Sequence, residues 1–323
     1  MFLIFKAIFE GIMKNNKSLY QQFCEEENVP LFLQYEWFNS LYKDDEWEVA
    51  IARKGENIQG ILPYVISKKK SFKVITPQFL SPYQGVWLKY PEGQKYASKL
   101  GYEKEVITSL IDQLPKIDAF KQSFMPGFTN WLPFSWKGFN QTTRYTYIIK
   151  NIFDLEKVFA DFKENIRREI RKAEKQLTIK EIDDIDLLYQ MKLRAYQDNN
   201  DNYPIPHEKL VNVHEFCKKV NCGELMVAED TNGNIHSIIL YVWDRFSAYY
   251  LHGVTDANYK TTGSMSLLLW EAIKRSSKRT KAFNFEGSMV ESIERYFRAF
   301  GGEQIPYFQI SKTDSKVLKL LNY

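Results

Sequence analysis

The chain has 323 residues, 44% of them hydrophobic and 15% aromatic, and its 44 Lys and Arg against 40 Asp and Glu give a formal net charge of +4. A domain usually takes about 100–200 residues, so two domains are expected, and this much apolar content excludes wholesale disorder. The near balance of charges argues against a dedicated nucleic-acid binder, which normally has a strongly basic domain.

The cysteines and the apolar runs argue against a disulfide-bonded protein and against a membrane span. Cys24, Cys217 and Cys222 are an odd set without CxxC spacing, so we expect no disulfide framework and a reducing, cytoplasmic location. No apolar run reaches the about 18 residues of a membrane span, so we expect no stable membrane insertion. Residues 1–13 are apolar but short, and we interpret them as a start-site extension or a small packing helix, with a membrane-surface helix as the alternative.

The first half of the chain is predicted to mix helices and strands. Apolar residues at helical or alternating spacing mark the elements, and a Lys-Gly-Glu-Asn turn marks a hairpin. Two aromatic-rich loops are interpreted as core packing, with stacking on a sugar or nucleobase as the alternative. The predicted elements are a helix over 31–42, strands over 47–53, 58–66 and 72–76, a helix over 103–114, and strands over 119–125 and 144–150.

The second half has a clearer order. Helices are followed by three consecutive strands, and then helix and strand alternate, which is neither a plain βα pattern nor an all-β pattern. The boundary between the halves is expected near residues 140–155. The predicted elements are helices within 153–176, a strand over 177–182, helices over 186–197 and 207–220, strands over 224–230, 234–243 and 247–254, a helix over 263–277, a strand over 282–286, a helix over 290–300 and a strand over 306–311.

A glycine-containing turn between a strand and a long helix, residues 256–264, is a candidate anion site. The first turn of a helix offers free backbone N–H groups and the positive end of the helix dipole. Lys260 adds a cation, while Thr261, Thr262 and Ser264 add hydroxyls. The pattern suits the pyrophosphate of a nucleotide-like cofactor, and an ordinary capped helix start is the alternative.

A basic stretch, residues 165–176, combines a buried apolar stripe with an outer face that carries Arg167, Arg171 and Lys175. Such a face can hold phosphates or a polyanionic substrate. The alternative is a solvated helix face that Glu164 partly neutralises.

A carboxylate, Glu286, stands where a strand ends and a Gly-Ser turn begins. Strand ends in α/β folds face binding crevices. Glu286 can accept a proton from an attacking amine, and Arg298 or Tyr296 can stabilise or reprotonate a leaving group. The alternative is a solvated or capping glutamate.

The preceding strand holds Tyr250 and His252, which simple alternation places on one face. A structural imidazole is the alternative for His252. Residues 207–222 contain two histidines and two cysteines but lack the usual zinc spacing, so no metal is expected.

Three segments together resemble the GNAT acyltransferase superfamily: residues 164–175 (ENIRREIRKAEK), 249–274 (YYLHGVTDANYKTTGSMSLLLWEAIK) and 283–302 (FNFEGSMVESIERYFRAFGG). The similarity is to the divergent branch related to the Fem-type peptidyltransferases and to the acetyltransferases grouped with cellulose-biosynthesis proteins. It extends over residues 145–312, and the first half resembles the degenerate first domain of the tandem members.

The resemblance implies an α+β fold with two tandem GNAT-like domains, residues 1–145 and 146–323, each a mixed, mostly antiparallel twisted sheet flanked by helices. It also implies a turn that holds the pyrophosphate of acyl-CoA, written in the family as Gln or Arg, two residues, Gly, one residue, then Gly or Ala. In the matching stretch of this chain Gly263 is kept, Lys260 replaces Arg or Gln, and Met265 replaces the small residue.

The Fem-type relatives use aminoacyl-tRNA and carry a Phe-Lys pair before Phe-Gly. The matching residues here are Phe297, Arg298, Phe300 and Gly301, with Arg in place of Lys. No sustained heptad provides the coiled-coil arm of several Fem-type enzymes, which favours a CoA thioester donor.

The sequence therefore predicts an acyltransferase that moves an acyl group from acetyl-CoA or a longer acyl-CoA to an amine, such as an amino sugar or cell-envelope precursor, in a cleft between the domains. The alternatives are a Fem-like aminoacyl-tRNA-dependent peptidyltransferase, with tRNA as a partner, and a non-catalytic binding protein with the GNAT fold. The predicted site residues are Glu286, Tyr250, His252 and Arg298 for catalysis, Val254, Lys260, Thr261, Thr262, Gly263 and Ser264 for the donor, and Arg167, Arg171 and Tyr296 for the substrate.

Overall fold

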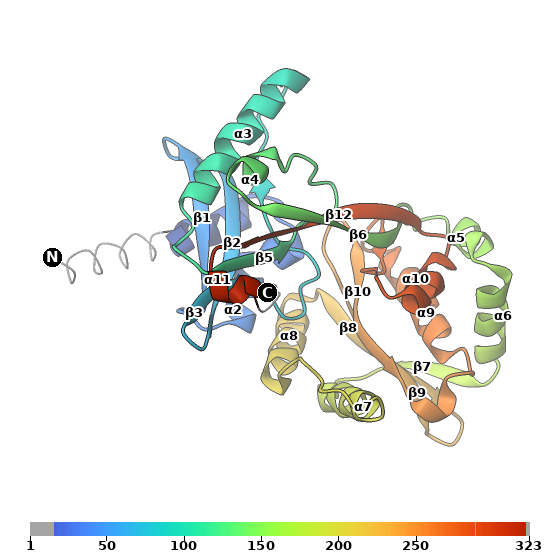
Figure 1. Cartoon of the computed structure of the whole chain (residues 1–323). Coiled ribbons are helices and arrows are strands. Elements are labelled where there is room, and N and C mark those ends of the chain that lie inside the picture. The colour runs from blue at the N-terminus through green and yellow to red at the C-terminus, as the bar shows by residue number, and fades with distance from the viewer. Residues whose placement is uncertain (1–15, 288, 321–323) are drawn as a thin grey trace. The chain divides into compact units, whose positions relative to one another are not determined.

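The computed structural model describes residues 16–287 and 289–320 (Figure 1), so the prediction for residues 1–13 falls outside the described residues. Among the described helices, none has the length and apolarity needed to cross a bilayer. Of the described residues, those up to Arg144 and those from Pro306 onward form one compact unit, and Tyr145–Ile305 form a second. The C-terminal strand, which the sequence assigned to the second domain, thus belongs mainly to the first unit.

The first unit is built on a β-hairpin whose strands pair antiparallel, as predicted. β3 and β5 pair in parallel, and β12 runs antiparallel to β5. Residues 16–26 are helical, which the sequence analysis did not predict. The remaining elements are η1 (Leu31–Leu33), α2 (Tyr35–Leu41), β1 (Trp47–Lys54), β2 (Asn57–Lys69), β3 (Phe72–Thr76), β4 (Trp87–Leu88), α3 (Tyr96–Asp112), β5 (Ala119–Ser123), α4 (Leu132–Trp136), β12 (Glu303–Thr313) and α11 (Lys316–Leu320).

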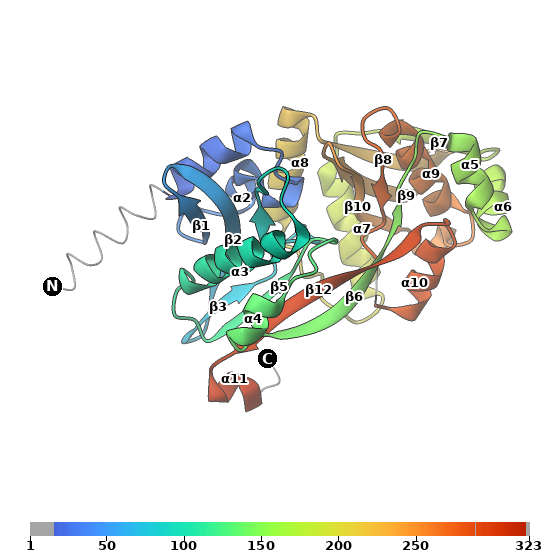
Figure 2. The ribbon, with the colours of Figure 1, turned by 90° about the horizontal axis from the view of Figure 1, so that it is seen from above.

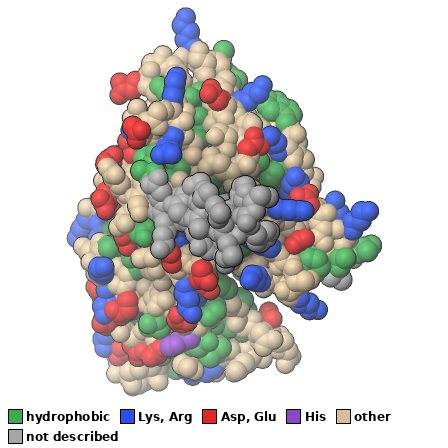
Figure 3. Space-filling model, turned by 90° about the vertical axis from the view of Figure 1, so that its left-hand side faces the viewer, with side chains coloured by type: hydrophobic (Ala, Val, Ile, Leu, Met, Phe, Trp, Pro, Cys, Tyr) green, Lys and Arg blue, Asp and Glu red, His purple; other side chains and the backbone are tan. Residues whose placement is uncertain are grey.

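Helix α3 covers one face of the first unit's sheet (Figure 2). Val106, Ile107 and Leu110 recur at helical spacing and are buried against Tyr64 and Ile75 of the sheet. Each fully buried aliphatic side chain contributes about 1.5–3 kcal/mol, so this interface stabilises the unit. On the face of the molecule that Figure 3 shows, basic and acidic side chains are interspersed, as the charge balance suggests.

The second unit has a mixed, mostly antiparallel sheet flanked by helices, and the predicted α+β class is confirmed. Its strand order is β6-β11-β10-β9-β8-β7, in which only β10 and β11 pair in parallel. Its elements are β6 (Asn140–Ile149), α5 (Leu155–Asp161), α6 (Glu164–Ala173), β7 (Leu177–Glu181), α7 (Ile185–Gln197), α8 (His207–Val220), β8 (Gly223–Asp230), β9 (Ile235–Trp243), β10 (Ala248–Thr255), η2 (Ala257–Tyr259), α9 (Ser264–Ser276), β11 (Phe283–Asn284) and α10 (Glu291–Arg298).

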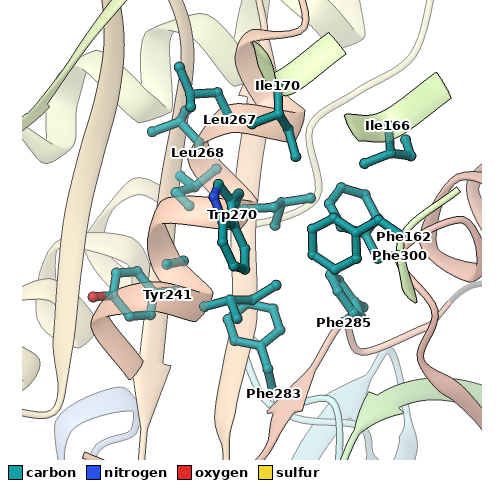
Figure 4. Close-up of a cluster of buried hydrophobic side chains, with 14 of the residues drawn as sticks. Phe162, Ile166, Ile170, Tyr241, Leu267, Leu268, Trp270, Phe283, Phe285 and Phe300 are labelled. Carbon is teal, nitrogen blue, oxygen red and sulfur yellow. The ribbon is translucent and has the colours of Figure 1, made fainter. Parts of the chain in front are cut away.

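An aromatic and aliphatic cluster joins α6, α9 and the segment after β11 (Figure 4). Ile166 and Ile170 of α6 are buried in it, so the predicted apolar stripe of this helix is confirmed. Phe162 packs edge-on against Trp270 and Phe300, with ring centroids 5.4 and 5.1 Å apart. The cluster holds the head of α9 and the end of β11 in fixed places, where the candidate site residues lie.

A β-bulge changes the side-chain alternation along β10. The pairing with β9 shifts between Tyr250 and His252, so that Tyr250 opposes Tyr241 and His252 opposes Leu240. Because the bulge inserts one extra residue, Tyr250 and His252 lie on opposite faces of the sheet. The prediction that they share a face is therefore wrong. An ideal Cβ built on Gly253 would lie 2.7 Å from the Tyr250 hydroxyl, as expected if Gly253 shares a face with Tyr250.

Candidate functional site

The parallel pairing of β10 with β11 is very short. Only Ala248–Phe283 and Tyr249–Asn284 are in register, whereas β10 continues to Thr255. Within residues 16–287 and 289–320, no strand pairs with this edge of β10 beyond Tyr249. Backbone groups of β10 up to Val254 are therefore available on that edge to a ligand.

Glu286 lies just past the end of β11 in a left-handed backbone conformation, with φ 61°. This conformation is rare for a residue with a side chain and clusters at functional sites. The Glu286 amide donates to Asn284 Oδ1 at 2.8 Å, which holds the turn. Its Oε1 atom is buried, and no described residue forms a hydrogen bond to it. Burial raises the pKa of the Glu286 carboxyl well above its usual value.

One half-buried tyrosine, Tyr250, lies close to Glu286, and a second, Tyr296, lies close to Tyr250. Burial, and secondarily the Glu286 charge, raise the pKa of Tyr250, so its hydroxyl stays protonated at neutral pH. Burial likewise raises the pKa of Tyr296, whose hydroxyl forms a 2.9 Å hydrogen bond with Ser266 Oγ. Ser266 in turn donates to Glu169 Oε2 at 2.9 Å. A hydrogen-bonded chain thus runs from Tyr296 of α10 through Ser266 of α9 to Glu169 of α6, and Tyr250 of β10 lies close enough to Tyr296 to affect its pKa.

His252 lies on the other face of β10, against α7. Its Nε2 atom forms a hydrogen bond with the Tyr203 hydroxyl, and the two rings stack with centroids 5.7 Å apart. Burial and then the nearby Lys192 charge lower the pKa of His252 well below its usual value, so the imidazole is neutral. The structure therefore does not bring His252 together with Glu286.

Lys192 and Tyr203 were not predicted from the sequence. Lys192 occupies the inward stripe of α7 with Ile185 and Leu188, a position where a cation is unusual, so its spacing was the available signal. Burial lowers the pKa of Lys192 to about 8. Tyr203 lies in the irregular segment between α7 and α8, and no local pattern marks it.

The turn before α9 contains a glycine in a left-handed backbone conformation. Gly263 is the N-cap of α9 and adopts φ 78°, and an ideal Cβ there would lie 2.7 Å from the Glu169 carbonyl oxygen of α6. No side chain caps α9, so its first N–H groups have no acceptor among the described residues. The Met265 side chain is half-buried and packs against the core cluster. The turn therefore offers backbone donors, with α6 packed on one side of it.

The hydroxyls of this turn are mostly used internally. Ser264 Oγ lies 2.7 Å from Ser237 Oγ and 3.2 Å from Thr262 Oγ1. Thr262 Oγ1 also donates to the Tyr259 carbonyl at 2.8 Å. Lys260 and Thr261 are exposed at the tip of the turn. Of the residues predicted to bind the donor, Lys260 and Thr261 are the two that are exposed to solvent.

The predicted arginines pair with carboxylates of their own helices. Arg167 donates to Glu164 Oε2 at 2.6 Å, and Arg171 lies 3.9 Å from the other oxygen of that carboxylate. Arg298 is exposed on α10 and donates to Glu294 Oε1 at 2.9 Å. Each of the three arginines thus has a carboxylate partner on its own helix other than Glu286.

One group of described side chains has ligand atoms close enough to hold a metal ion. Asp183, His214 and Glu215 offer atoms within 4.8 Å of one another. The Lys218 ammonium donates to Asp183 Oδ2 at 2.6 Å and competes with a cation there. All three cysteines are free thiols.

Comparison with known proteins finds a family match within the second unit. Residues 160–285 match the family model described as the acetyltransferase (GNAT) domain. The predicted resemblance to the GNAT superfamily is thereby confirmed. A search of curated proteins finds no significant match.

Solved structures share the fold over nearly the whole chain. FemX aligns with a TM-score of 0.65 and 13% identity, covering 95% of this chain and 98% of FemX. L-PGS from Bacillus licheniformis aligns with a TM-score of 0.55 and 10% identity, covering 94% of each chain. A tandem GNAT protein from the clavulanic acid biosynthesis pathway aligns with a TM-score of 0.52 and 8% identity, covering 93% of this chain and 94% of that protein. At these identities the likeness establishes the fold alone, and that fold is the predicted tandem GNAT-like one.

Proposed function

We propose that this chain, whose residues 160–285 form an acetyltransferase (GNAT) domain, is an N-acyltransferase with acyl-CoA as donor and an amine as acceptor. The observation that carries the proposal is the Oε1 atom of Glu286, which is buried and has no hydrogen-bond partner among the described residues, just past the short pairing of β11 with β10. A strained residue, a raised pKa and free backbone donors at one place are typical of a catalytic centre rather than of a structural turn.

The donor is assigned to the turn before α9 and to the edge of β10. The N–H groups at the head of α9 and the Lys260 ammonium bind the diphosphate of CoA, because a helix start attracts anions. Backbone N–H groups between Tyr250 and Val254 polarise the thioester carbonyl. We assign no donor contact to the Thr262 and Ser264 hydroxyls, since they are hydrogen-bonded to each other and to Ser237 or Tyr259.

The reaction is a transfer between a thioester and an amine. The amine nitrogen attacks the thioester carbonyl carbon, and the Glu286 carboxylate accepts the proton that the nitrogen loses. The C–S bond then breaks, and the Tyr250 hydroxyl donates a proton to the leaving thiolate. Tyr250 suits this role because its raised pKa keeps it protonated. Holding amine and thioester together supplies much of the rate.

The raised pKa of Glu286 sets the sign of the pH dependence. A carboxyl with a raised pKa stays protonated to a higher pH than an exposed carboxyl, and it cannot act as a base while it is protonated. We expect kcat/KM to rise with pH through this pKa. A rate that falls as pH rises over the same range would contradict the assignment of Glu286 as base.

The acceptor is an amine small enough to reach Glu286, and an amino sugar or cell-envelope precursor remains the proposed class. A cytoplasmic location fits both an acyl-CoA donor and the three free thiols.

Calorimetry with the full chain tests donor binding. Acetyl-CoA and longer acyl-CoAs are titrated into the protein and into two variants, Lys260→Gln at the head of α9 and Lys278→Gln just past its other end. We expect saturable binding that Lys260→Gln weakens roughly tenfold, as for loss of one charge-assisted hydrogen bond, and that Lys278→Gln leaves unchanged. Absence of binding at millimolar ligand would remove the acyl-CoA proposal.

A further inference from the structure

His236 is a buried residue of β9 that the proposed acyl transfer does not use. It is 6% exposed and lies beside the start of the donor turn, residues 256–264, because β9 pairs antiparallel with β10. The Asp256 amide donates to the His236 carbonyl at 2.9 Å, so the backbone of β9 holds the point where the chain leaves β10. The contacts of the His236 imidazole therefore bear directly on the conformation of the donor turn.

Both ends of the exposed tip of the donor turn contact the His236 ring. The Thr262 amide donates to the Tyr259 carbonyl at 3.1 Å and closes a four-residue turn, whose central residues are Lys260 and Thr261. The Tyr259 ring stacks on the imidazole, with ring centroids 3.8 Å apart and an interplanar angle of 5°. Thr262 Oγ1 lies 3.3 Å from Nδ1 of the same imidazole. One side chain thus contacts the first and the last residue of the tip.

The other ring nitrogen of His236 faces Asp230, the last residue of β8. Nε2 of His236 lies 3.3 Å from Asp230 Oδ2. Hydrogen bonds from the Asn234 side chain and then from the Asn234 amide lower the pKa of Asp230 to about 2, so its carboxylate is ionised at neutral pH and only accepts hydrogen bonds. Nε2 therefore carries the hydrogen of this bond, and Asp230 fixes the orientation of the imidazole.

The tip of the donor turn has few contacts of its own. Lys260 and Thr261 are exposed, and no residue within 16–287 or 289–320 forms a hydrogen bond or ion pair with the Lys260 ammonium. A flexible turn loses conformational entropy when it binds a ligand, and this loss weakens binding. A turn that is already held in one conformation loses less, so the contacts of His236 favour binding at Lys260.

We propose that His236 is a positioning residue for the donor, which holds Tyr259 and Thr262 so that the Lys260 ammonium and the first N–H groups of α9 meet the diphosphate together. The inference rests on the proposed function, because it takes acyl-CoA to bind at the donor turn. His236 acts only through the turn and makes no contact with the donor itself.

A double-mutant cycle with the full chain and acetyl-CoA tests the proposal. We expect His236→Ala to weaken acetyl-CoA binding roughly tenfold in calorimetry, because the released turn must then be ordered on binding. In the His236→Ala background, Lys260→Gln should cause less than about a threefold further loss, instead of the roughly tenfold loss expected in the wild-type chain, since both residues act through one turn. A merely structural histidine would leave the effect of Lys260→Gln unchanged, so additive losses would overturn the proposal.

Two further variants separate positioning from folding. Tyr259→Ala removes the stacked ring from a half-buried residue of the turn, and it should weaken acetyl-CoA binding even if His236→Ala does not fold. His214→Ala is the matched control, since His214 of α8 is also buried and lies 3.6 Å from the Asp183 carboxylate. It should leave acetyl-CoA binding unchanged, and chemical denaturation measures the stability of each variant. Wild-type affinity in Tyr259→Ala, or an equal loss of affinity in His214→Ala, would overturn the proposal.

Binding by the wild-type chain separates this proposal from the proposed function. If the wild-type chain binds acetyl-CoA and folded His236→Ala binds it equally well, only the role of His236 is overturned. If the wild-type chain does not bind acetyl-CoA at millimolar concentration, the donor assignment is overturned and the role of His236 with it.

Discussion

Each unit contains a strand, a helix and a second strand that pairs in parallel with the first. The two strand–helix–strand motifs differ in the residues that follow this parallel pairing. In the first unit β3 and β5 share two register pairs, Val74–Ala119 and Ile75–Phe120. In the second unit β10 and β11 also share two, Ala248–Phe283 and Tyr249–Asn284. The same short parallel contact thus occurs in both, with α3 or α9 as the crossover helix.

Beyond this parallel contact, the first unit continues the backbone pairing between the segment that follows β3 and the end of β5. Gln84 forms a parallel bridge to Phe124. The backbone amide of Gln84 donates to the Ser123 carbonyl at 2.6 Å, and its backbone carbonyl accepts from the Met125 amide at 3.2 Å. Gly85 is packed so closely under Phe124 that an ideal Cβ would lie 2.4 Å from the ring. Within the described part of the chain, this edge thus keeps a backbone partner as far as Met125.

The second unit leaves the corresponding edge unpaired. The Phe285 amide turns to the Tyr147 carbonyl of β6, at 3.0 Å, instead of to β10, and Glu286 follows with its buried carboxylate. The helix that follows also begins differently, since α9 starts at a left-handed glycine and α3 starts after Lys95. The same strand–helix–strand order therefore leads to a paired strand edge in the first unit and to a strand edge that a ligand can reach in the second. The difference lies in the loops rather than in the strand order.

The largest expected effect is on catalysis in the second unit. Glu286→Gln keeps the size of the side chain and removes the base, so kcat should fall about 10²–10⁴-fold while acyl-CoA binding is unchanged. Release of free CoA thiol measures the rate, and calorimetry measures the binding. Glu291→Gln, exposed on α10, is the control. Full activity of Glu286→Gln would contradict the proposal that the second unit, with its unpaired strand edge, carries out catalysis.

Glycine substitutions compare the two turns directly. Gly263→Ala and Gly85→Ala each introduce a side chain at positive φ, with backbone or ring atoms within 3 Å, and each should lower the free energy of unfolding by about 1–3 kcal/mol. Only Gly263→Ala should also weaken acyl-CoA binding. Gly101→Ala, in open space on α3, should instead stabilise by about 0.5–1 kcal/mol. Chemical denaturation measures the free energy of unfolding of all three variants. Loss of acyl-CoA binding in Gly85→Ala would contradict the proposal that the donor binds in the second unit.

Buried charge gives a further contrast. In the first unit the Glu103 carboxylate accepts hydrogen bonds from Tyr90 and Asn130, at 2.8 and 2.7 Å. In the second unit the pKa of Lys192 is lowered from 10.5 to about 8 by burial. Between these values the unfolded chain binds more protons, so stability rises with pH across this window, and the burial cost is complete below pH 8.

Lys192→Met should therefore stabilise the protein by about 1–3 kcal/mol at pH 7, and the gain should shrink as pH approaches 10.5. Unfolding in denaturant at pH 7 and pH 10 measures it, with the exposed Lys219→Met as control. A destabilised Lys192→Met at pH 7 would show that the ammonium is satisfied in the native protein.

The smallest effect is expected on the outer face of α6. Arg167 and Arg171 pair with Glu164 at the surface, so reversing both charges should change stability by less than about 1 kcal/mol and leave acyl-CoA binding intact. A gel shift with tRNA is the decisive control. Salt-sensitive tRNA binding that the reversal abolishes would favour the aminoacyl-tRNA-dependent alternative.

Most elements could be predicted from the sequence, since periodicity and turn residues are local signals. The hairpin around Gly55, the stripe of Ile166 and Ile170, and the glycine turn before α9 all follow from neighbouring residues. The predicted helix over 31–42 is divided into η1 and α2, because the Leu31–Leu33 turn closes before Gln34, which is extended.

The site was only partly predictable. Tyr250 lies close both to Glu286 and to Tyr296 in the structure, but His252 is moved to the opposite face by a bulge that alternation does not reveal. Arg167 and Arg171 were predicted to hold negative charge of the substrate, with partial neutralisation by Glu164 as the alternative, and the structure pairs both with Glu164.

Residue spacing alone thus determined the order of helices and strands, the glycine bend and the acidic residue after a short strand. Tertiary structure decided where β10 loses its partner, which face receives His252, and that the last strand joins the first unit. The physical reason is that each of these depends on pairing and packing between segments far apart in the chain, which local propensity does not specify.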